Sequence, residues 1–136
     1  MRILGIDFGD SRTGFAISDP LGFGVTTLPL LHEKNMRKTA DYAAALAKEK
    51  QAEKIVLGLP KNMDGSVGFR GERTREFAAL LAERVSMEII FWDERLTTVS
   101  AQHLMNETDV RGKKRKARLD SVSAAYILQS YLDSLK

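Results

Sequence analysis

The stretch Ile3-Leu4-Gly5-Ile6-Asp7-Phe8-Gly9 places a single carboxylate inside a run of apolar residues and glycines. The run lacks the alternation of apolar and polar residues that marks a half-exposed strand, so it predicts a strand over residues 2–8 that is buried on both faces. A buried charge is unfavourable unless it is paired, protonated or bound to a metal ion. No Lys, Arg or His lies within four residues of Asp7. Asp7 therefore needs a partner from elsewhere in the chain.

The residues that follow Asp7 predict an antiparallel meander. Residues 9–12 have the composition of a turn, and apolar runs at 13–19 and 23–31 predict a second and a third strand. The links between these strands are short, which implies antiparallel pairing. Asn35 then predicts the N-cap of a helix that ends near Lys50.

The second half of the chain alternates between short apolar runs and helical patterns. It predicts a fourth strand at residues 54–59, a helix at 72–85 and a fifth strand at 88–92. Two further helices are predicted, one from Thr98 onward and one at 120–135. Helices between strands imply parallel pairing among strands 1, 4 and 5. The predicted fold class is α/β: one domain over residues 1–136, with a five-stranded mixed sheet, antiparallel in strands 1–3 and parallel in 1, 4 and 5, flanked by helices.

Composition limits the possible classes of function. The chain has 136 residues, of which 43% are hydrophobic and 29% are charged, as in ordinary globular domains. It contains no cysteine, which excludes disulfides, zinc–thiolate sites, iron–sulfur clusters and thiol catalysis. The N-terminus does not resemble a secretory signal, and no apolar run approaches the roughly 20 residues of a membrane helix. The cytoplasm is the expected location.

Basic residues are concentrated in one segment. Residues 111–118 hold six of them and no acid, whereas the formal net charge of the chain is only +3, so the remainder is mildly acidic. A run of this kind is often a solvated loop without a ligand. Because it ends two residues before Asp120, a phosphate-binding loop formed by Lys113, Lys114, Arg115 and Lys116 is also expected.

Three acids come from separate predicted elements: Asp7 from a central strand, Glu94 from the end of a strand and Asp120 from the start of a helix. Carboxylates brought together repel one another unless a cation is present. Hard oxygen ligands without His or Cys suit Mg²⁺ or Mn²⁺, and two such ions can clamp the oxygens of a phosphodiester. We therefore expect these three acids to be metal ligands and catalytic residues.

Each acid also has a structural interpretation. Asp120 can be a helix N-cap, Glu94 a surface carboxylate, and Asp7 a hydrogen-bonded structural acid. For the neighbouring Asp93, a surface ion pair with Arg95 is the preferred interpretation.

Basic residues are also expected near the carboxyl ends of the parallel strands. In an open α/β sheet, sites form beyond the carboxyl ends of the parallel strands, where residues 7–9, 59–62 and 93–95 are expected to meet. Arg12, in the turn after the first strand, can bind a phosphate, although a plain hairpin is the alternative. Lys61 and Arg70, in the glycine-rich loop after the fourth strand, are further candidates for nucleic-acid binding.

Several motifs together resemble one known family, the YqgF/RuvX-type nucleases. The motifs occur in the family's order: Gly5-Ile6-Asp7-Phe8-Gly9 with Arg12 and Gly14, Gly58-Leu59-Pro60 with Asp64-Gly65, Asp93-Glu94-Arg95-Leu96-Thr97-Thr98, and Asp120-Ser121 with Ala124-Ala125. The resemblance implies an RNase H-like fold and a bacterial cytoplasmic role in maturing the 5′ end of 16S ribosomal RNA, with resolution of Holliday junctions as an earlier assignment. The family's acids fall on Asp7, Glu94 and Asp120. Related resolvases usually carry a second acid three residues along the last helix, where this chain has Ser123.

The sequence therefore predicts a hydrolase acting on ester bonds, a metal-dependent endonuclease for structured nucleic acid. Its expected partners are precursor ribosomal RNA, or branched DNA, and ribosomal particles, with no membrane. The expected assembly is a monomer or a weak homodimer. Two alternatives stay open: a Holliday-junction resolvase-like DNA nuclease, and a nucleic-acid-binding assembly factor that does not cleave.

Overall fold

Five strands form one mixed sheet in this computed structural model, which describes residues 1–96 and 112–136, and only the backbone for residues 112–121. The strands are β1 (Ile3–Asp7), β2 (Arg12–Ser18), β3 (Val25–His32), β4 (Lys54–Leu59) and β5 (Glu88–Asp93). Their order in the sheet is β3-β2-β1-β4-β5. β1 and β3 are antiparallel to β2, and β4 is parallel to both β1 and β5. The predicted fold class is confirmed.

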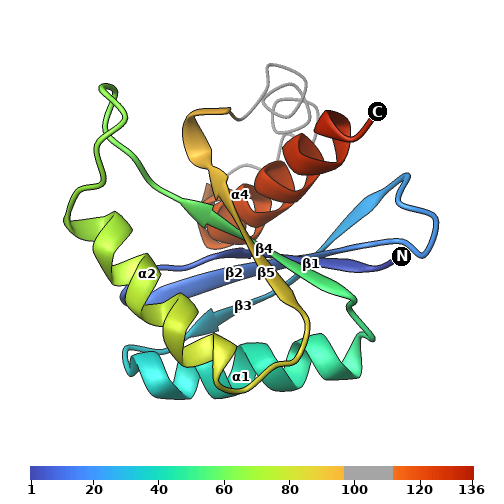
Figure 1. The fold of residues 1–136 in the computed structure, drawn as a ribbon, viewed down its shortest axis with the longest axis horizontal. Coiled ribbons are helices and arrows are strands. Elements are labelled where there is room, and N and C mark those ends of the chain that lie inside the picture. Colours follow the sequence, from blue (N-terminus) through green and yellow to red (C-terminus); the bar gives the residue numbers. More distant parts are fainter. Residues whose placement is uncertain (97–111) are drawn as a thin grey trace.

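Helices cover both faces of the sheet (Figure 1). They are α1 (Met36–Glu49), α2 (Phe69–Ala82) and α4 (Gly112–Ser134), with a short 3₁₀ helix, η1 (Glu94–Leu96), directly after β5. The helices α1 and α2 pack on one face and share a core with Leu4 and Ile6 of β1. On the other face α4 packs alone among the described helices, with Ile3 and Val56 in its core.

The alternation of side chains along β1 decides where Asp7 points. Leu4 and Ile6 belong to the core under α1 and α2, and Ile3 belongs to the core under α4. Successive side chains of a strand point to opposite faces, so Asp7 lies on the face of α4. On the same face, a Cβ on Gly5 would lie 2.9 Å from Leu128 Cβ and 3.0 Å from the Ala124 carbonyl oxygen, so this glycine lets α4 lie directly over β1.

A local signal explains where α1 begins but not where α2 begins. The side chain of Asn35 caps α1 as predicted, because its Oδ1 accepts a hydrogen bond from the Lys38 amide at 3.1 Å. The helix α2 begins at Phe69, earlier than the predicted residue 72. Gly71 lies in its first turn, where a Cβ would come within 2.8 Å of the Pro60 carbonyl oxygen. The glycine that suggested a loop is therefore required for close packing of a helix.

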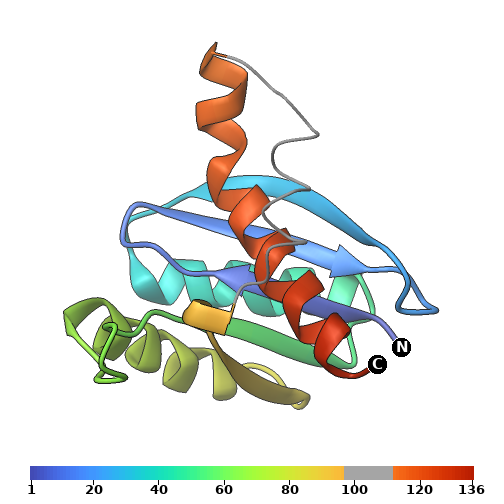
Figure 2. The ribbon, with the colours of Figure 1, turned by 90° about the horizontal axis from the view of Figure 1, so that it is seen from above.

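The last helix requires a larger correction. The predicted basic loop is wrong for residues 112–118, because α4 begins at Gly112 and contains them. Asp120 consequently lies inside a helix and not at its N-cap. Lys, Arg and Ala have high helix propensity, which explains why this run continues the helix. Figure 2 shows the amino-terminal part of α4, in orange, extending past β3 at the edge of the sheet.

Some predictions lie outside the described residues: the helix capped by Thr98, and Arg111 of the basic run. Among the residues that the structure describes, no helix is long and apolar enough to cross a membrane.

Candidate functional site

Asp7 and Glu94 are brought together at the carboxyl ends of the parallel strands. Asp7 is the last residue of β1, and Glu94 begins η1 directly after β5. The strand between them is β4, so the two acids are separated by one strand of the sheet. Both are half-buried, and for Asp7 this differs from the fully buried position that the sequence predicts, because the end of β1 borders an open pocket.

Gly58 of β4 makes this approach possible. The register pairs Ile6 with Leu57, so Asp7 and Gly58 are the next residues along neighbouring strands. A Cβ on Gly58 would lie 2.9 Å from Glu94 Oε1 and would also collide with the Ile127 side chain of α4. The Glu94 carboxylate therefore occupies the space that any other residue at position 58 would fill.

The two carboxyl groups share a hydrogen bond. Such a bond requires that one of the two groups keeps its proton. Burial raises the pKa of Glu94 above its ordinary value, and the charge of Asp93 adds to this effect, while the hydrogen bond with Asp7 and the charge of Arg70 oppose it. A half-buried acid with a raised pKa beside a second acid is typical of a functional site.

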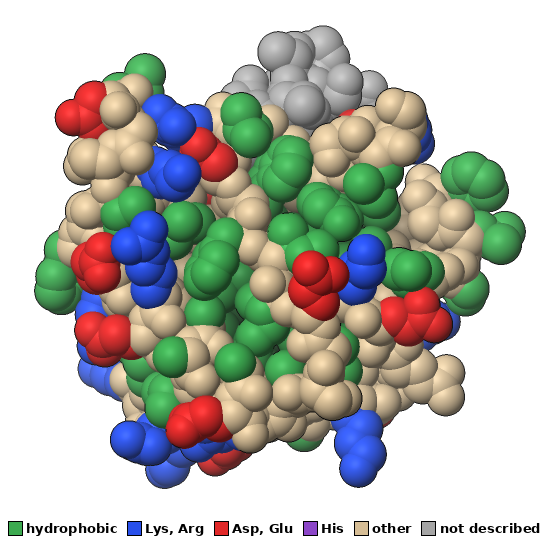
Figure 3. All heavy atoms as spheres, in the orientation of Figure 1, with side chains coloured by type: hydrophobic (Ala, Val, Ile, Leu, Met, Phe, Trp, Pro, Cys, Tyr) green, Lys and Arg blue, Asp and Glu red, His purple; other side chains and the backbone are tan. Residues whose placement is uncertain are grey.

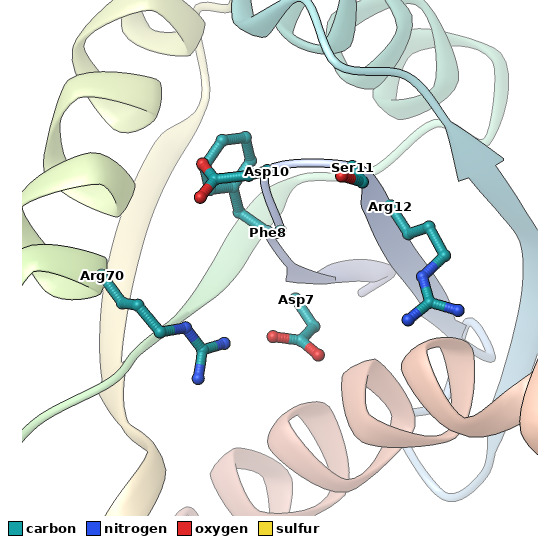
Figure 4. A pocket seen from close by; sticks show the side chains of 7 residues that line it. Asp7, Phe8, Asp10, Ser11, Arg12 and Arg70 are labelled. Carbon is teal, nitrogen blue, oxygen red and sulfur yellow. The ribbon is translucent and has the colours of Figure 1, made fainter.

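Arginines flank Asp7 in a pocket of about 250 Å³, which is lined by residues 7–12 and Arg70. Figure 4 shows Arg70 of α2 and Arg12 of β2 on opposite sides of Asp7, with the Asp7 carboxylate pointing into the space between them. The preceding turn is tied to α2 by an ion pair of 3.2 Å between Asp10 Oδ1 and Arg73 Nε. The structure therefore brings Arg12 and Arg70 to Asp7.

Lys61 also follows the carboxyl end of a parallel strand, but it faces Asp93 and not Asp7 or Glu94. Its Nζ is 3.9 Å from Asp93 Oδ2. Asp93 also forms a bidentate ion pair with Arg95, whose Nη2 lies 2.7 Å from Oδ2 and whose Nε lies 3.1 Å from Oδ1. The preferred interpretation of Asp93, an ion pair with Arg95, is confirmed.

The residues present fit a divalent cation. Two carboxylates that share a proton offer hard oxygen ligands for which Mg²⁺ or Mn²⁺ would replace that proton. No group of three or more Asp, Glu, His or Cys placed for a metal ion occurs among the described residues. Asp120, the third expected ligand, belongs to α4, one helical turn before Ala124, and its side chain is not among those described. The same is true of the side chains of Lys113, Lys114, Arg115 and Lys116.

Sequence reasoning missed Gly58 as a site residue and missed the contacts of Arg95 beyond Asp93. A glycine inside an apolar strand is a signal for close approach by another group, so the role of Gly58 had a detectable trace. Arg95 also donates hydrogen bonds to the carbonyl oxygens of Asn62 and Met63, more than thirty residues earlier in the chain. No local pattern indicates these contacts.

The strand order, the parallel pairing of β1, β4 and β5 and the acids at their carboxyl ends together define a protein of the RNase H-like nuclease class. The family model described as "RuvX: Holliday junction resolvase" matches residues 1–134. The chain belongs to the RuvX family, as its motifs indicate.

Relatives of known name agree with this assignment. A protein of Clostridium novyi (strain NT) is 47% identical over 135 residues, which is 99% of this chain and 100% of the relative. One of Acetivibrio thermocellus is 47% identical over 136 residues, which is 98% of this chain and 96% of the relative. Both bear the name "Putative pre-16S rRNA nuclease". The predicted class, a nuclease that hydrolyses phosphodiester bonds, is confirmed.

The fold alone is shared with a more distant structure, that of T. thermophilus RuvC in complex with a Holliday junction substrate. It matches with a TM-score of 0.68 at 8% identity and covers 100% of this chain and 97% of that chain. The match confirms the RNase H-like fold.

Proposed function

We propose that this protein is a metal-dependent endonuclease that processes the 5′ end of precursor 16S ribosomal RNA in the cytoplasm, with ribosomal particles among its partners. The observation that carries the proposal is the Asp7–Glu94 carboxyl pair at the carboxyl ends of parallel strands, in which Asp7 lies between Arg12 and Arg70. The names of the relatives support ribosomal RNA as the substrate.

Each residue has a defined role in this proposal. Asp7, Glu94 and Asp120 hold Mg²⁺ or Mn²⁺, which activates water and stabilises charge on the reacting phosphate when bound. Arg12 and Arg70 bind the phosphates on either side of the acids and orient the strand. Lys61 and the basic residues Lys113, Lys114, Arg115 and Lys116 bind the backbone farther along the substrate.

A second candidate is cleavage of branched DNA. The description of the matching family as a Holliday junction resolvase favours it. The same carboxyl pair would serve either substrate, because the chemistry at phosphorus is the same for RNA and DNA.

A single-turnover assay with Mn²⁺ separates these functions. An end-labelled precursor 16S fragment and a four-way DNA junction are each mixed with excess wild-type protein, Asp7→Asn or Glu72→Gln. Glu72 forms an exposed ion pair with Arg75 on α2 and does not line the pocket, so it serves as the control.

We expect time-dependent cleavage of the RNA by wild type and by Glu72→Gln. Asp7→Asn should lose cleavage and keep its affinity for RNA within a few-fold, because ion placement matters mainly in the transition state. Cleavage of the junction alone would favour the DNA function. If all three proteins bind the RNA and none cleaves it, the result would favour a non-cleaving assembly factor.

A further inference from the structure

A compact turn at residues 62–66, between β4 and α2, contacts Arg95, the residue after Glu94. The amide of Asn62 donates to the Ser66 carbonyl oxygen and the amide of Gly65 donates to the Asn62 carbonyl oxygen, both at 2.9 Å. The Asp64 carboxylate accepts from the amide and the hydroxyl of Ser66, at 2.9 and 2.6 Å. Gly65 has φ of +91°, which a residue with a side chain rarely adopts. The turn is therefore ordered by its own hydrogen bonds.

Arg95 fastens this turn to the end of β5. Its Nη1 lies 3.2 Å from the Met63 carbonyl oxygen and 3.4 Å from that of Asn62. The other side of the same guanidinium forms the bidentate pair with Asp93, and the amide of Arg95 donates to Asp93 Oδ1 at 2.9 Å. One side chain thus links two segments that are far apart in the sequence. Figure 3 shows basic and acidic side chains side by side at this upper-left corner of the molecule.

Asp93 is the residue through which Arg95 can influence the site. Its side chain is only 14% exposed, and it directly precedes Glu94. The hydrogen bond from the Arg95 amide to Asp93 closes the turn in which Glu94 points back over Gly58. Any shift of Asp93 would therefore move the Glu94 carboxylate relative to Asp7.

The charge of Arg95 has a second effect. Asp93 carries a negative charge next to Glu94, where the phosphate of a substrate must approach. The Arg95 guanidinium, 2.7 Å away, neutralises that charge. Lys61 is more distant, at 3.9 Å. Without Arg95, Asp93 would attract Lys61 more strongly and leave it less available for the substrate.

We propose that Arg95 is a positioning residue of this site: its guanidinium locks Asp93 and the 62–66 turn into one unit that aims Glu94 and leaves Lys61 available to a substrate phosphate. The inference rests on the proposed nuclease function for its kinetic consequences. Its structural part, the locking of the turn, is independent of substrate.

Two substitutions separate the geometry of Arg95 from its charge. Arg95→Gln removes both the charge and the bidentate fork, whereas Arg95→Lys keeps the charge and removes the fork. The matched control is Arg84→Gln. Arg84 likewise combines ion pairs, with Asp41 at 2.5 Å and Glu83 at 3.7 Å, with a hydrogen bond to a carbonyl oxygen, that of Leu80 at 2.7 Å. It precedes β5, at the opposite end of the sheet.

The experiment combines hydrogen exchange with single-turnover kinetics on the full chain. We expect the amides of residues 62, 65 and 66 to exchange about tenfold faster in both Arg95 variants and at the wild-type rate in Arg84→Gln. Cleavage at saturating RNA should fall by up to about 100-fold in both Arg95 variants, because a small misplacement of Glu94 is enough. Apparent RNA affinity should fall only in Arg95→Gln, because Lys restores the charge.

The proposal is overturned if the 62–66 amides keep wild-type exchange in Arg95→Gln, if Arg95→Lys restores the cleavage rate, or if Arg84→Gln loses as much activity. Absence of cleavage by wild type would instead contradict the proposed function, and the exchange rates would still decide the role of Arg95.

Discussion

Glu94 is subject to opposing influences that together determine its pKa. Burial is the largest, and with the charge of Asp93 it raises the pKa, against the hydrogen bond with Asp7 and the charge of Arg70. The folded protein therefore holds a proton on Glu94 in a pH range where the unfolded chain has released it. The free energy of unfolding falls with pH across this range, because the unfolded state binds fewer protons.

Glu94→Gln should remove this pH dependence. Stability from the protonated Glu94 is fully present below the unfolded pKa and is lost as the pH rises through the raised, folded pKa. Gln keeps a hydrogen bond to Asp7 and does not titrate. The free energy of unfolding of the variant should therefore rise relative to that of wild type as the pH rises through that window. Above the window, the difference between the two should stay constant. Urea unfolding of metal-free protein at a series of pH values measures this difference. A difference that is independent of pH would contradict the raised pKa.

Gly58→Ala tests whether the missing side chain creates the site. The new methyl group would displace the Glu94 carboxylate and the tip of Ile127, both ends of flexible side chains. We expect a stability loss of about 1–3 kcal/mol from overpacking and a much larger proportional loss of cleavage. Val56→Ala, in the buried core on the same face of β4, is the control of similar stability cost. Equal loss of activity in the two variants would mean that Gly58 acts only through stability.

At the scale of elements, α4 serves two purposes. Its buried half carries Ala124 and Leu128 against β1, where Gly5 permits close packing. Its amino-terminal part carries the basic residues of positions 113–118 on a helix that extends past β3 (Figure 2). A helix fixes the spacing of these cations along one direction, which a loop would not do.

Neutralising Lys113, Lys114, Arg115 and Lys116 to Gln should weaken RNA binding to a similar degree for all sequences. The slope of log affinity against log salt should flatten by about 0.7–0.9 for each phosphate that the variant no longer neutralises, because fewer counterions are released on binding. Fluorescence anisotropy over a salt series gives this slope. An unchanged slope would show that the basic run does not bind the substrate.

At the scale of the whole molecule, the topology gathers the site. Parallel pairing of β1, β4 and β5 places their carboxyl ends at the same end of the sheet. There, α2 supplies Arg70 and β2 supplies Arg12. A cation at this edge would bind residues far apart in the chain, which occur together only in the folded state. Its binding should therefore stabilise the whole fold.

Mn²⁺ should raise the melting temperature of wild type. At an Mn²⁺ concentration a hundredfold above the dissociation constant, binding adds about 2.7 kcal/mol to the free energy of unfolding. Asp7→Asn should lose most of this rise, and Glu72→Gln, which alters an exposed acid on α2, should keep it. Thermal scans with Mn²⁺ and with a chelator measure the shift. An equal rise in Asp7→Asn would place the ion elsewhere.

Local sequence patterns are enough to predict the class of fold, the family and the end of the sheet at which Asp7 and Glu94 meet. Strand periodicity, the Asn35 cap and the links between strands all act over a few residues, so they can be read along the chain. The Asp93–Arg95 pair was predictable for the same reason, since its members are two residues apart.

Tertiary structure decided the rest. The hydrogen bond between Asp7 and Glu94, its dependence on Gly58 and the hydrogen bonds of Arg95 with the 62–66 turn each join segments that are distant in the sequence. The basic run belongs to a helix, although its concentrated charge suggested a solvated loop. Such interactions depend on the register of β1, β4 and β5 and on the close approach of α4. Apart from the glycine at position 58, no local pattern of residues indicates these long-range contacts.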